Sequence, residues 1–238
     1  MTIRIIIVSL LASAFTSCTS VEKKPDNTVK VVGQMRNVMW KGQLTGTIDL
    51  DTISNKTHLY GLGPVEYLAG EILIIDGKCY KSTVTSETSM IVEETFSVKA
   101  PFFGYANIAK WKASALPDSV QTIHQLEQYL DQITATSPRP FMFRINGVVE
   151  EAKIHVVNLP KGSKVSSPAE AHQGQVNYHL NNEASEIIGF FSSKHKAIFT
   201  HHDTFLHMHL ITTNRAMMGH LDALLLKRGG AMLFLPAE

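Results

Sequence analysis

The sequence predicts a fold that is rich in strands and has one clear helix, and three observations support this prediction. Short apolar runs end in Asp-Gly or Asn-Gly pairs, which is typical of β-hairpins because both turn positions favour positive φ angles. Only one segment, at residues 120–133, places apolar residues at three- and four-residue steps. The chain has 238 residues, of which 44% are hydrophobic, and this composition excludes disordered and collagen-like proteins. The length suits one sizeable domain.

The N-terminus carries the pattern of an export signal. Arg4 precedes an apolar run over residues 5–15, which is shorter than the ~20 residues that span a bilayer. Two small residues then precede Cys18, and this arrangement resembles the lipobox of bacterial lipoproteins. The resemblance implies a signal peptide at residues 1–17 and a lipid on Cys18; an ordinary signal peptide with an incidental cysteine is the alternative. We therefore expect a cell-envelope protein, lipid-anchored or periplasmic, that contacts the membrane only through this anchor.

A polar spacer and one long domain follow the signal. Residues 18–29 are polar and include Pro25, so they are predicted to form a flexible tether before a domain at residues 30–238. Removal of residues 1–17 takes away only one charged residue, Arg4, from 22 basic and 21 acidic residues. Because the remaining charges balance, we expect no nucleic-acid partner. With Cys18 lipidated, Cys79 is the only free thiol and no disulfide is expected.

Two hairpins and one helix are the clearest elements of the domain. Residues 71–80 place Asp76-Gly77 between two apolar runs, and residues 141–149 repeat the pattern around Asn146-Gly147. Between them, Asp118-Ser119 is expected to cap a helix that ends near Thr136, ahead of two prolines. Residues 160–182 are rich in Gly, Ser and Pro and are predicted to form a long surface connection.

The residues with the strongest chemical signal lie after residue 200. A strand over residues 205–211 would place His207 and His209 on one face, about 6.5–7 Å apart, and three apolar residues on the other. After a loop over residues 212–218, His220 begins the next segment and adds a third imidazole. Three protein ligands with one open position are typical of catalytic zinc. The pattern therefore predicts a Zn²⁺ site at these three histidines.

Other interpretations of the histidines stay open at this point. The chain has 11 His, so some clusters arise by chance, and a helix over residues 216–225 would point His220 elsewhere. Three imidazoles also suit iron, nickel or copper. A cupin-like metal enzyme has a similar His-x-His strand, although Ile211 to Asn214 follow here in place of the usual Glu. A non-catalytic metal- or ligand-binding lipoprotein is the third alternative.

Several short motifs, in order along the chain, resemble the bacterial α-acetolactate decarboxylase family. In the C-terminal part these are Gly189 to Ser193, His207-Met208-His209, Asn214-Arg215 and Gly219-His220. In the N-terminal part they are Tyr60 to Gly63, Leu68 to Glu71 and Asp76 to Lys78, followed by Phe143 to Gly147. Each motif alone is weak, but the ordered set runs from about residue 30 to residue 236.

The resemblance implies an α+β fold of two related β-rich halves with mixed sheets and a few helices, and a homodimer. It implies zinc held by His207, His209 and His220, with Glu71 and Arg144 as catalytic residues facing the metal. The reaction would convert 2-acetolactate, a small keto-hydroxy acid, to acetoin and carbon dioxide. Its ketone and hydroxyl oxygens can chelate one metal ion, which would act as a Lewis acid when the carbon–carbon bond breaks.

Arg144 and Glu71 have residue chemistry that fits these roles. The guanidinium of Arg144 can bind a carboxylate with two parallel hydrogen bonds, although a solvent-facing Arg on an edge strand is the alternative. Glu71 begins an apolar strand, where its carboxylate could ligate zinc or, with a raised pKa, deliver a proton. A simple strand-end charge is its alternative, and Glu66 is a competitor in the same loop.

Two positions depart from the family pattern. Pro64 follows Gly-x-Gly where the family usually has Thr, which removes a hydroxyl and a backbone donor. The family also uses a second glutamate in a C-terminal extension. Beyond Asp222 the only acidic side chain in this sequence is Glu238, a residue expected to fray.

Overall fold

The computed structural model describes residues 26–194, 198 and 204–237. The predicted signal peptide, Cys18, most of the predicted tether and Glu238 lie outside the described residues. The helices are α1 (Met35–Lys41), α2 (Ile123–Ile133) and α3 (Pro168–Ala171), with 3₁₀ turns η1 (Leu50–Thr52) and η2 (Glu66–Leu68). The strands are β1 (Lys30–Gly33), β2 (Ile48–Asp49), β3 (Leu59–Pro64), β4 (Glu71–Ile75), β5 (Lys78–Ser86), β6 (Ser89–Glu94), β7 (Lys99–Ala100), β8 (Phe102–Asn107), β9 (Trp111–Ala115), β10 (Phe141–Val156), β11 (Val176–Phe191), β12 (Leu206–Thr212), β13 (Met218–Leu226) and β14 (Met232–Pro236).

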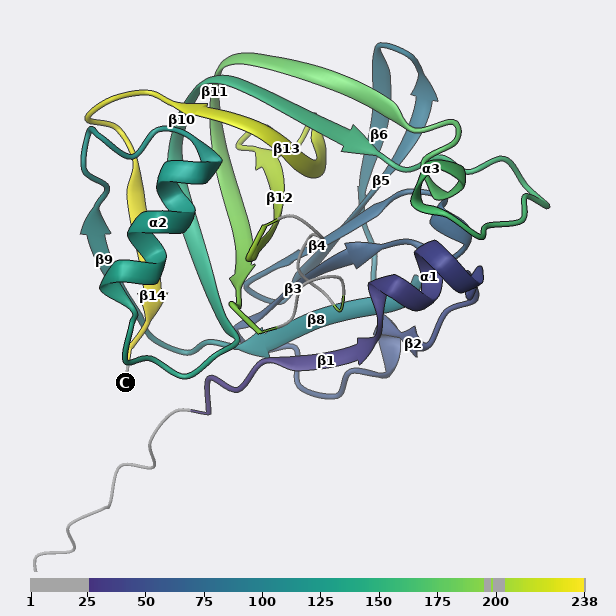
Figure 1. Cartoon of the computed structure of the whole chain (residues 1–238), viewed down its shortest axis with the longest axis horizontal. Coiled ribbons are helices and arrows are strands. Elements are labelled where there is room, and N and C mark those ends of the chain that lie inside the picture. The colour runs from purple at the N-terminus through teal and green to yellow at the C-terminus, as the bar shows by residue number, and fades with distance from the viewer. Residues whose placement is uncertain (1–25, 195–197, 199–203, 238) are drawn as a thin grey trace, which may run out of the picture.

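Two six-stranded sheets form the body of the molecule, which confirms the β-rich α+β prediction (Figure 1). The first sheet comes from the N-terminal half and has the order β1-β8-β3-β4-β5-β6. The second comes mainly from the C-terminal half and has the order β11-β12-β13-β10-β14-β9. Where the prediction has mixed sheets, every strand pair in the described part of the chain is antiparallel.

The second sheet closes on itself through its longest strands. β10 pairs with β11 along one edge, and along the other edge it pairs with β14 near Arg144 and with β13 near Ile154. Because β11 also pairs with β12, and β12 with β13, these four strands form a ring. Leu206, Met208 and Leu210 point into the ring, where they join a core that α2 covers from one side (Figure 1). The predicted apolar face of the histidine strand is therefore confirmed.

A second core joins the two sheets. Phe190 and Ile188 of β11 pack against Leu62 and Leu73 of the first sheet. Gly104 of β8 allows this close approach, since a Cβ atom there would lie 2.6 Å from the ring of Phe190. The outer face of the ring is thus buried against the first sheet.

The structure confirms one predicted hairpin and corrects the other. Asp76 and Gly77 connect β4 to β5 with φ angles of 47° and 79°, as a hairpin turn with positive φ angles requires. Asn146-Gly147, however, is not a turn, because β10 runs straight through it and pairs with β11 on one side. Glycine is needed there for a different reason: a Cβ atom at Gly147 would lie 3.0 Å from the backbone of Ala231.

The predicted helix exists, but its start is wrong. α2 begins after Thr122, whose hydroxyl accepts a hydrogen bond from the Gln125 amide in a capping box. The predicted cap residue Asp118 instead accepts a hydrogen bond from Gly229 N. In a capping box the residue three positions after the cap both donates to and accepts from it. Gln125 does both, because its backbone N donates to the Thr122 hydroxyl and its side-chain Oε1 accepts from Thr122 N.

Two further boundaries differ from the prediction. The expected surface connection at residues 160–182 contains α3 and ends early, because β11 starts at Val176. Residues 216–225 are not a helix, since β13 occupies most of them and directs His220 toward its strand neighbours. The predicted strand and loop that precede β13 are confirmed.

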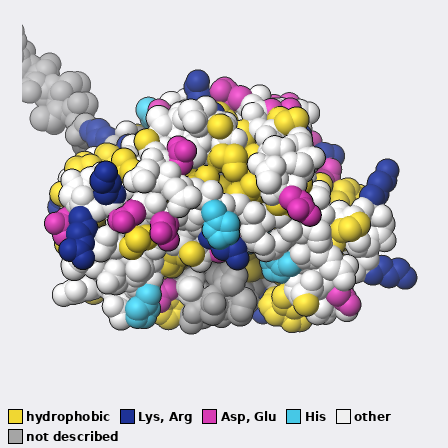
Figure 2. Space-filling model, turned by 90° about the horizontal axis from the view of Figure 1, so that it is seen from above, with side chains coloured by type: hydrophobic (Ala, Val, Ile, Leu, Met, Phe, Trp, Pro, Cys, Tyr) yellow, Lys and Arg dark blue, Asp and Glu magenta, His cyan; other side chains and the backbone are white. Residues whose placement is uncertain are grey.

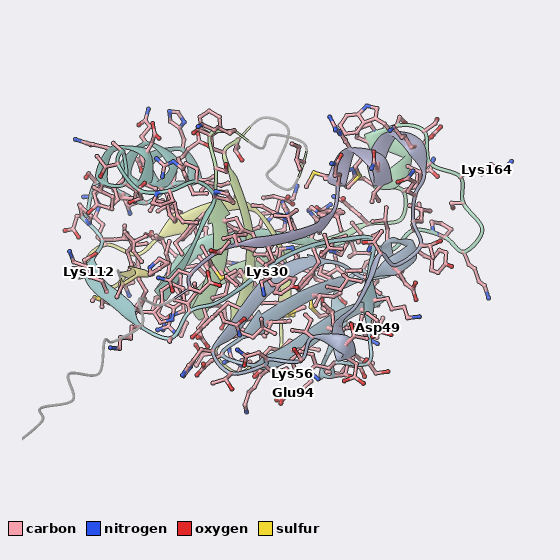
Figure 3. All side chains as sticks on the ribbon, turned by 90° about the horizontal axis from the view of Figure 1, so that it is seen from below. Lys30, Asp49, Lys56, Glu94, Lys112 and Lys164 are labelled. Carbon is pink, nitrogen blue, oxygen red and sulfur yellow. The ribbon has the colours of Figure 1, made fainter. Side chains whose placement is uncertain are left out.

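The two ends of the described chain meet on one side of the molecule. The Asn27 amide donates a hydrogen bond to Ala237 O, whereas α1 and α3 lie together at the opposite end (Figure 1). Side chains of both charge signs are scattered over the face in Figure 2 around a central group of hydrophobic side chains. The exposed side chains of Lys112 and Lys164 mark the two ends of the molecule in Figure 3. Within the described residues, no helix has the length and apolar character needed to cross a membrane.

Candidate metal centre and its pocket

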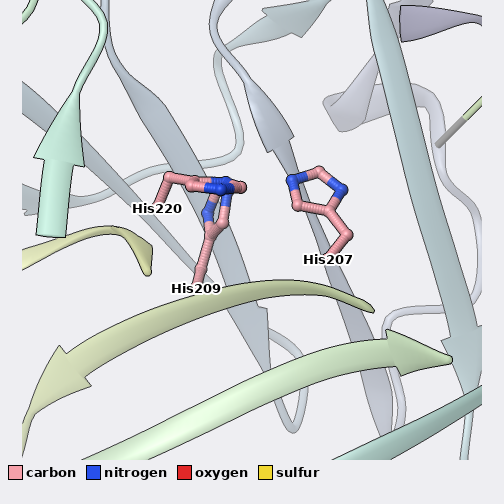
Figure 4. Close-up of side chains that lie close together, drawn as sticks. All are labelled: His207, His209 and His220. Carbon is pink, nitrogen blue, oxygen red and sulfur yellow. The ribbon is translucent and has the colours of Figure 1, made fainter. Parts of the chain in front are cut away.

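The three predicted histidines converge on one point (Figure 4). β12 carries His207 and His209 on its face toward the first sheet, and β13 places His220 directly opposite His209. One ring nitrogen from each side chain lies within 4.8 Å of the other two. Gly219 permits this register, because a Cβ atom there would lie 2.4 Å from the backbone oxygen of His155 on β10. The three side chains can therefore hold one metal ion.

His209 shows that this cluster fits a cation. Its side chain is fully buried, and neither ring nitrogen has a hydrogen-bond partner in the described part of the chain. Burial lowers the pKa of His209 well below its usual range, and the neighbouring His207 and His155 lower it further. The backbone of Ile72, which is near the ring but outside hydrogen-bond geometry, opposes this shift. A buried polar atom without a partner costs about 1–3 kcal/mol, and a neutral imidazole is the form that binds a metal. Coordination would satisfy a nitrogen that the protein leaves bare.

Glu71 is the carboxylate that the first sheet brings to this cluster. Its Oε2 lies 3.5 Å from His209 Nε2, and its Oε1 accepts a hydrogen bond from Val157 N at 3.3 Å. Burial raises the pKa of Glu71 well above its usual range, the Val157 hydrogen bond opposes this, and the charge of Asp222 adds to it. The competitor Glu66 lies elsewhere and accepts a hydrogen bond from Gly46 N. The structure thus joins Glu71, and not Glu66, to the histidines.

A pocket with an empty volume of about 530 Å³ opens onto the cluster. Its walls come from both sheets and from α1 and α3, and most of them are apolar. His207 and His220 line it, while His209 lies behind them. The other lining residues are Met35, Met39, Trp40, Pro64, Leu68, Glu71, Phe102, His155, Val157, Pro168 and His172. A small molecule that enters would reach the histidines through a mostly apolar passage.

Comparison with known proteins decides the family. The family model of alpha-acetolactate decarboxylase matches residues 32–233. The chain belongs to the alpha-acetolactate decarboxylase family. An alpha-acetolactate decarboxylase from Lactococcus lactis subsp. cremoris is 24% identical over 191 residues, which cover 79% of this chain and 76% of that protein. The chain is therefore a member of a carboxy-lyase family, and the cupin-like alternative is not supported.

Solved structures agree with the fold. The crystal structure of alpha-acetolactate decarboxylase from Bacillus subtilis strain 168 superimposes with a TM-score of 0.71 at 19% identity, over 88% of this chain and 86% of that one. A Staphylococcus aureus protein of unknown function, described as similar to alpha-acetolactate decarboxylase, gives a TM-score of 0.69 at 15% identity, over 87% and 84% of the two chains. At these identities the likeness establishes the fold alone.

Arg144, predicted from the family resemblance to face the metal, does not line the pocket. It is on the first half of β10, where its guanidinium carbon is 4.2 Å from the ring centroid of Phe234 and 5.6 Å from that of Trp111. It is not among the residues that line the pocket, and within the described chain it makes no ion pair. The strand registers place Arg144 opposite Ile188 of β11, and Ile188 opposite His209 of β12, so Arg144 is in register with His209 but two strands away from it. Its catalytic role stays a prediction.

The two departures from the family pattern fall on different parts of the chain. Pro64 ends β3 and lines the pocket, so the residue that replaces the usual Thr does lie beside the histidines. Glu238, the candidate for the second acid, lies outside the described residues.

Two residues of the pocket region were missed from the sequence. His155, near the end of β10, lies opposite His220 and lines the pocket, and Asp222 accepts a hydrogen bond from its ring. His220-x-Asp222 on one strand was a usable signal for Asp222, because residues two apart share a face. No local pattern pointed to His155, since its pairing with β13 joins segments more than 60 residues apart across a bulge.

Proposed function

We propose that the protein is a zinc-dependent decarboxylase that converts 2-acetolactate to acetoin and carbon dioxide. The observation that carries the proposal is the buried ring of His209, whose two nitrogens have no hydrogen-bond partner among the described residues and whose Nε2 lies 3.5 Å from Glu71 Oε2. This ring stands with two other imidazoles at the base of a pocket in a member of this family. The nitrogen and oxygen donors nearby suit Zn²⁺.

The reaction needs a group that stabilises the electron pair left by carbon dioxide, and then a proton donor. When the bond between the carboxylate and C2 breaks, carbon dioxide leaves and the electron pair moves toward the ketone oxygen. Chemistry of this kind is supplied by a bound zinc ion acting as a Lewis acid. A proton then returns to C2 and gives acetoin. His207, His209 and His220 would hold the ion at the base of the pocket, and the apolar walls would exclude water from the developing charge.

Glu71 is proposed to supply the proton. Its carboxyl lines the pocket and lies beside His209, and burial favours the protonated form. A protonated carboxyl at this site can act as a general acid, a step that contributes roughly 10²–10⁴-fold to a rate. The alternative, in which Glu71 is a fourth metal ligand, is separated from this one by a variant described in the Discussion.

The decisive experiment combines metal analysis with an acetoin assay. The purified protein is expected to contain one zinc ion per chain and to release acetoin from racemic 2-acetolactate. Chelation should abolish turnover, and added zinc should restore it. The His209→Ala variant is expected to lose both metal and turnover, because two ring ligands alone hold zinc poorly. His124→Ala is a matched control, since that imidazole is on the exposed surface of α2 and bonds only to Gln128 among the described residues.

Each alternative has a distinct outcome in these assays. Bound zinc without acetoin release would support a non-catalytic metal-binding protein. Acetoin release that survives complete removal of metal would refute the zinc site. If the purified protein contains a different, tightly bound metal and has full turnover, the decarboxylase activity is supported and the assignment of zinc is wrong.

The location of the protein and its assembly are further proposals from the sequence. We propose that Cys18 carries a lipid that anchors the protein in the cell envelope, and that the protein forms a homodimer. The described chain begins at the end opposite α1 and α3, two elements that line the pocket (Figure 1). Cys18→Ser should move the protein from the membrane to the soluble fraction, and light scattering measures the oligomeric state.

A further inference from the structure

His155 forms the wall of the pocket next to the histidine cluster. It is paired with His220 across β10 and β13, and their ring centroids are 4.7 Å apart. The residue is only 6% exposed, yet it lines the pocket. A ligand that reaches His220 therefore also passes the ring of His155.

Asp222 fixes the orientation of this ring. Both of its carboxylate oxygens lie close to His155 Nδ1, at 2.8 and 2.9 Å. A carboxylate accepts but does not donate, so Nδ1 must carry the hydrogen. In the neutral ring Nε2 then carries the lone pair, and within the described chain Nε2 makes no hydrogen bond. The pocket thus presents a hydrogen-bond acceptor whose direction is set by Asp222.

Acceptors of this kind are scarce in the pocket. Most of the lining is apolar, and besides the histidines of the cluster the other side chains with strong acceptors are Glu71, which the proposed function assigns to proton transfer, and His172 of the α3 segment, whose Nδ1 donates to Pro168 O at 2.6 Å. The imidazoles of His207 and His220 are assigned to the metal under the proposed function. A substrate hydroxyl bound beside the metal would need an acceptor for its hydrogen, and His155 Nε2 is placed to be that acceptor.

From this geometry we propose that His155 recognises the hydroxyl group of the substrate and that Asp222 is a positioning residue that fixes its tautomer. The inference rests on the proposed function for the identity of the substrate. It specifies the ligand class as 2-hydroxy acids with a tertiary hydroxyl, in preference to otherwise equal acids without it. A site that hydrogen-bonds a hydroxyl rejects the analogue that lacks it, because a buried acceptor is then left unpaired.

The test measures binding, so that it does not depend on turnover. Two unreactive ligands are compared on the zinc-loaded full-length protein by calorimetry: 2-hydroxy-2-methylpropanoate and 2,2-dimethylpropanoate, which differ only by hydroxyl against methyl. The wild type is expected to bind the hydroxy acid at least roughly tenfold more tightly. His155→Phe, which keeps a flat ring, should reduce this preference about fivefold or more while the zinc content stays unchanged.

Two more variants separate recognition from a structural role. His155→Gln carries an amide oxygen near the former position of Nε2 and should recover part of the preference. Asp222→Asn should weaken the preference in the wild-type background but add nothing to His155→Phe, because Asp222 is proposed to act on the hydroxyl through that ring. Asp222 Oδ1 also lies 4.0 Å from His220 Nε2, so the zinc content of each variant is measured alongside. A merely structural Asp222 would lower stability in both backgrounds and leave the preference of each unchanged.

The outcomes that overturn the inference are distinct from those that overturn the proposed function. An unchanged preference in His155→Phe with zinc retained refutes hydroxyl recognition. Loss of zinc in both His155→Phe and His155→Gln would make His155 a support of the metal site and also refute it. A preference that falls in His155→Phe with zinc retained, in a protein that releases no acetoin, would sustain the recognition and refute the decarboxylase.

Discussion

The two six-stranded sheets differ in how they use buried polar side chains. In the described part of the chain, the first sheet buries only Glu71 and Ser82 among polar residues on its strands. The second sheet buries six on its strands: His155, Ser185, His207, His209, Thr212 and His220. Buried polar groups destabilise a fold unless they form hydrogen bonds or bind a metal. The free-energy penalty of the site therefore falls mainly on the second sheet, while the first sheet contributes mostly apolar side chains.

This difference follows from how each sheet is closed. The ring in the second sheet gives β12 two buried faces, one toward the core of the ring and one toward the first sheet, and all seven of its residues are buried. Alternation along β12 then places apolar residues inside the ring and His207 and His209 outside it, still buried. The first sheet contributes one side chain to the proposed chemistry, the carboxyl of Glu71. Replacing this carboxyl tests whether the first sheet takes part in the reaction.

The largest effect is expected from Glu71→Gln. This variant keeps the shape and the hydrogen bond to Val157 but cannot transfer a proton, so turnover should fall roughly 10²–10⁴-fold. In the wild type the rate should fall as pH rises through the raised pKa of Glu71, because the proton donor is then lost. At low pH the rate should fall because protonation of the histidines releases the metal. Since the pKa of His209 is lowered, this loss should occur at a lower pH than for an ordinary histidine. Rate profiles of kcat against pH measure both limbs.

The zinc content of the same variant decides between the two roles of Glu71. If Glu71 is a proton donor, Glu71→Gln should retain its zinc. Glu71→Asp should then show the same fall of kcat at high pH as the wild type, at a lower rate. Loss of zinc in Glu71→Gln would instead make Glu71 a ligand, and the first sheet would then share in building the metal centre.

The contact between the sheets is expected to dominate stability. In Gly104→Ala the new methyl would lie 2.6–2.8 Å from two ring atoms of Phe190, so either the ring or β8 must shift. Overpacking of this kind destabilises by about 1–3 kcal/mol, which thermal unfolding would detect. Gly229→Ala is not a suitable control because its φ angle is 69°, whereas Gly230→Ala meets only one atom, 3.9 Å away. Equal stability of the Gly104 and Gly230 variants would show that the sheets separate easily.

Arg144→Ala should affect stability but not catalysis. Its guanidinium packs on Phe234 and Trp111, and such contacts contribute about 0.5–2 kcal/mol. Because Arg144 does not line the pocket, zinc content and turnover are expected to match the wild type. Arg144→Lys keeps the charge but not the flat surface, and should lose part of the same stability. A large loss of turnover in both variants would restore the role that the family resemblance implied.

Short sequence patterns correctly predicted the elements that are determined by neighbouring residues in the sequence. Strand alternation was enough to place His207 and His209 on one face, and Asp76-Gly77 formed the expected turn because its two φ angles are a property of that dipeptide. The same reasoning failed at Asn146-Gly147, where glycine serves a tertiary contact with Ala231. A short motif cannot reveal which of the two reasons applies.

The pocket was only partly predictable for the same reason. Glu71 reached the cluster through the family resemblance, whereas His155 depends on the register of β10 against β13, which includes two irregularities. Arg144 and His155 lie on one strand, and its pairing places His155 directly opposite His220, whereas β11 lies between Arg144 and His209. Long-range register is set by packing of the whole sheet and leaves no signature in the nearby sequence.

The smallest expected effect concerns Cys79 of the first sheet. The thiol is fully buried, and burial raises its pKa to about 12. Only the thiolate reacts with alkylating agents, so the native protein should not be labelled by iodoacetamide at Cys79 at pH 8, whereas the unfolded protein should be labelled quickly. Mass spectrometry of the peptide that contains Cys79 measures this. Rapid labelling of the folded chain would mean that the first sheet opens locally, so that its apolar side chains do not stay buried.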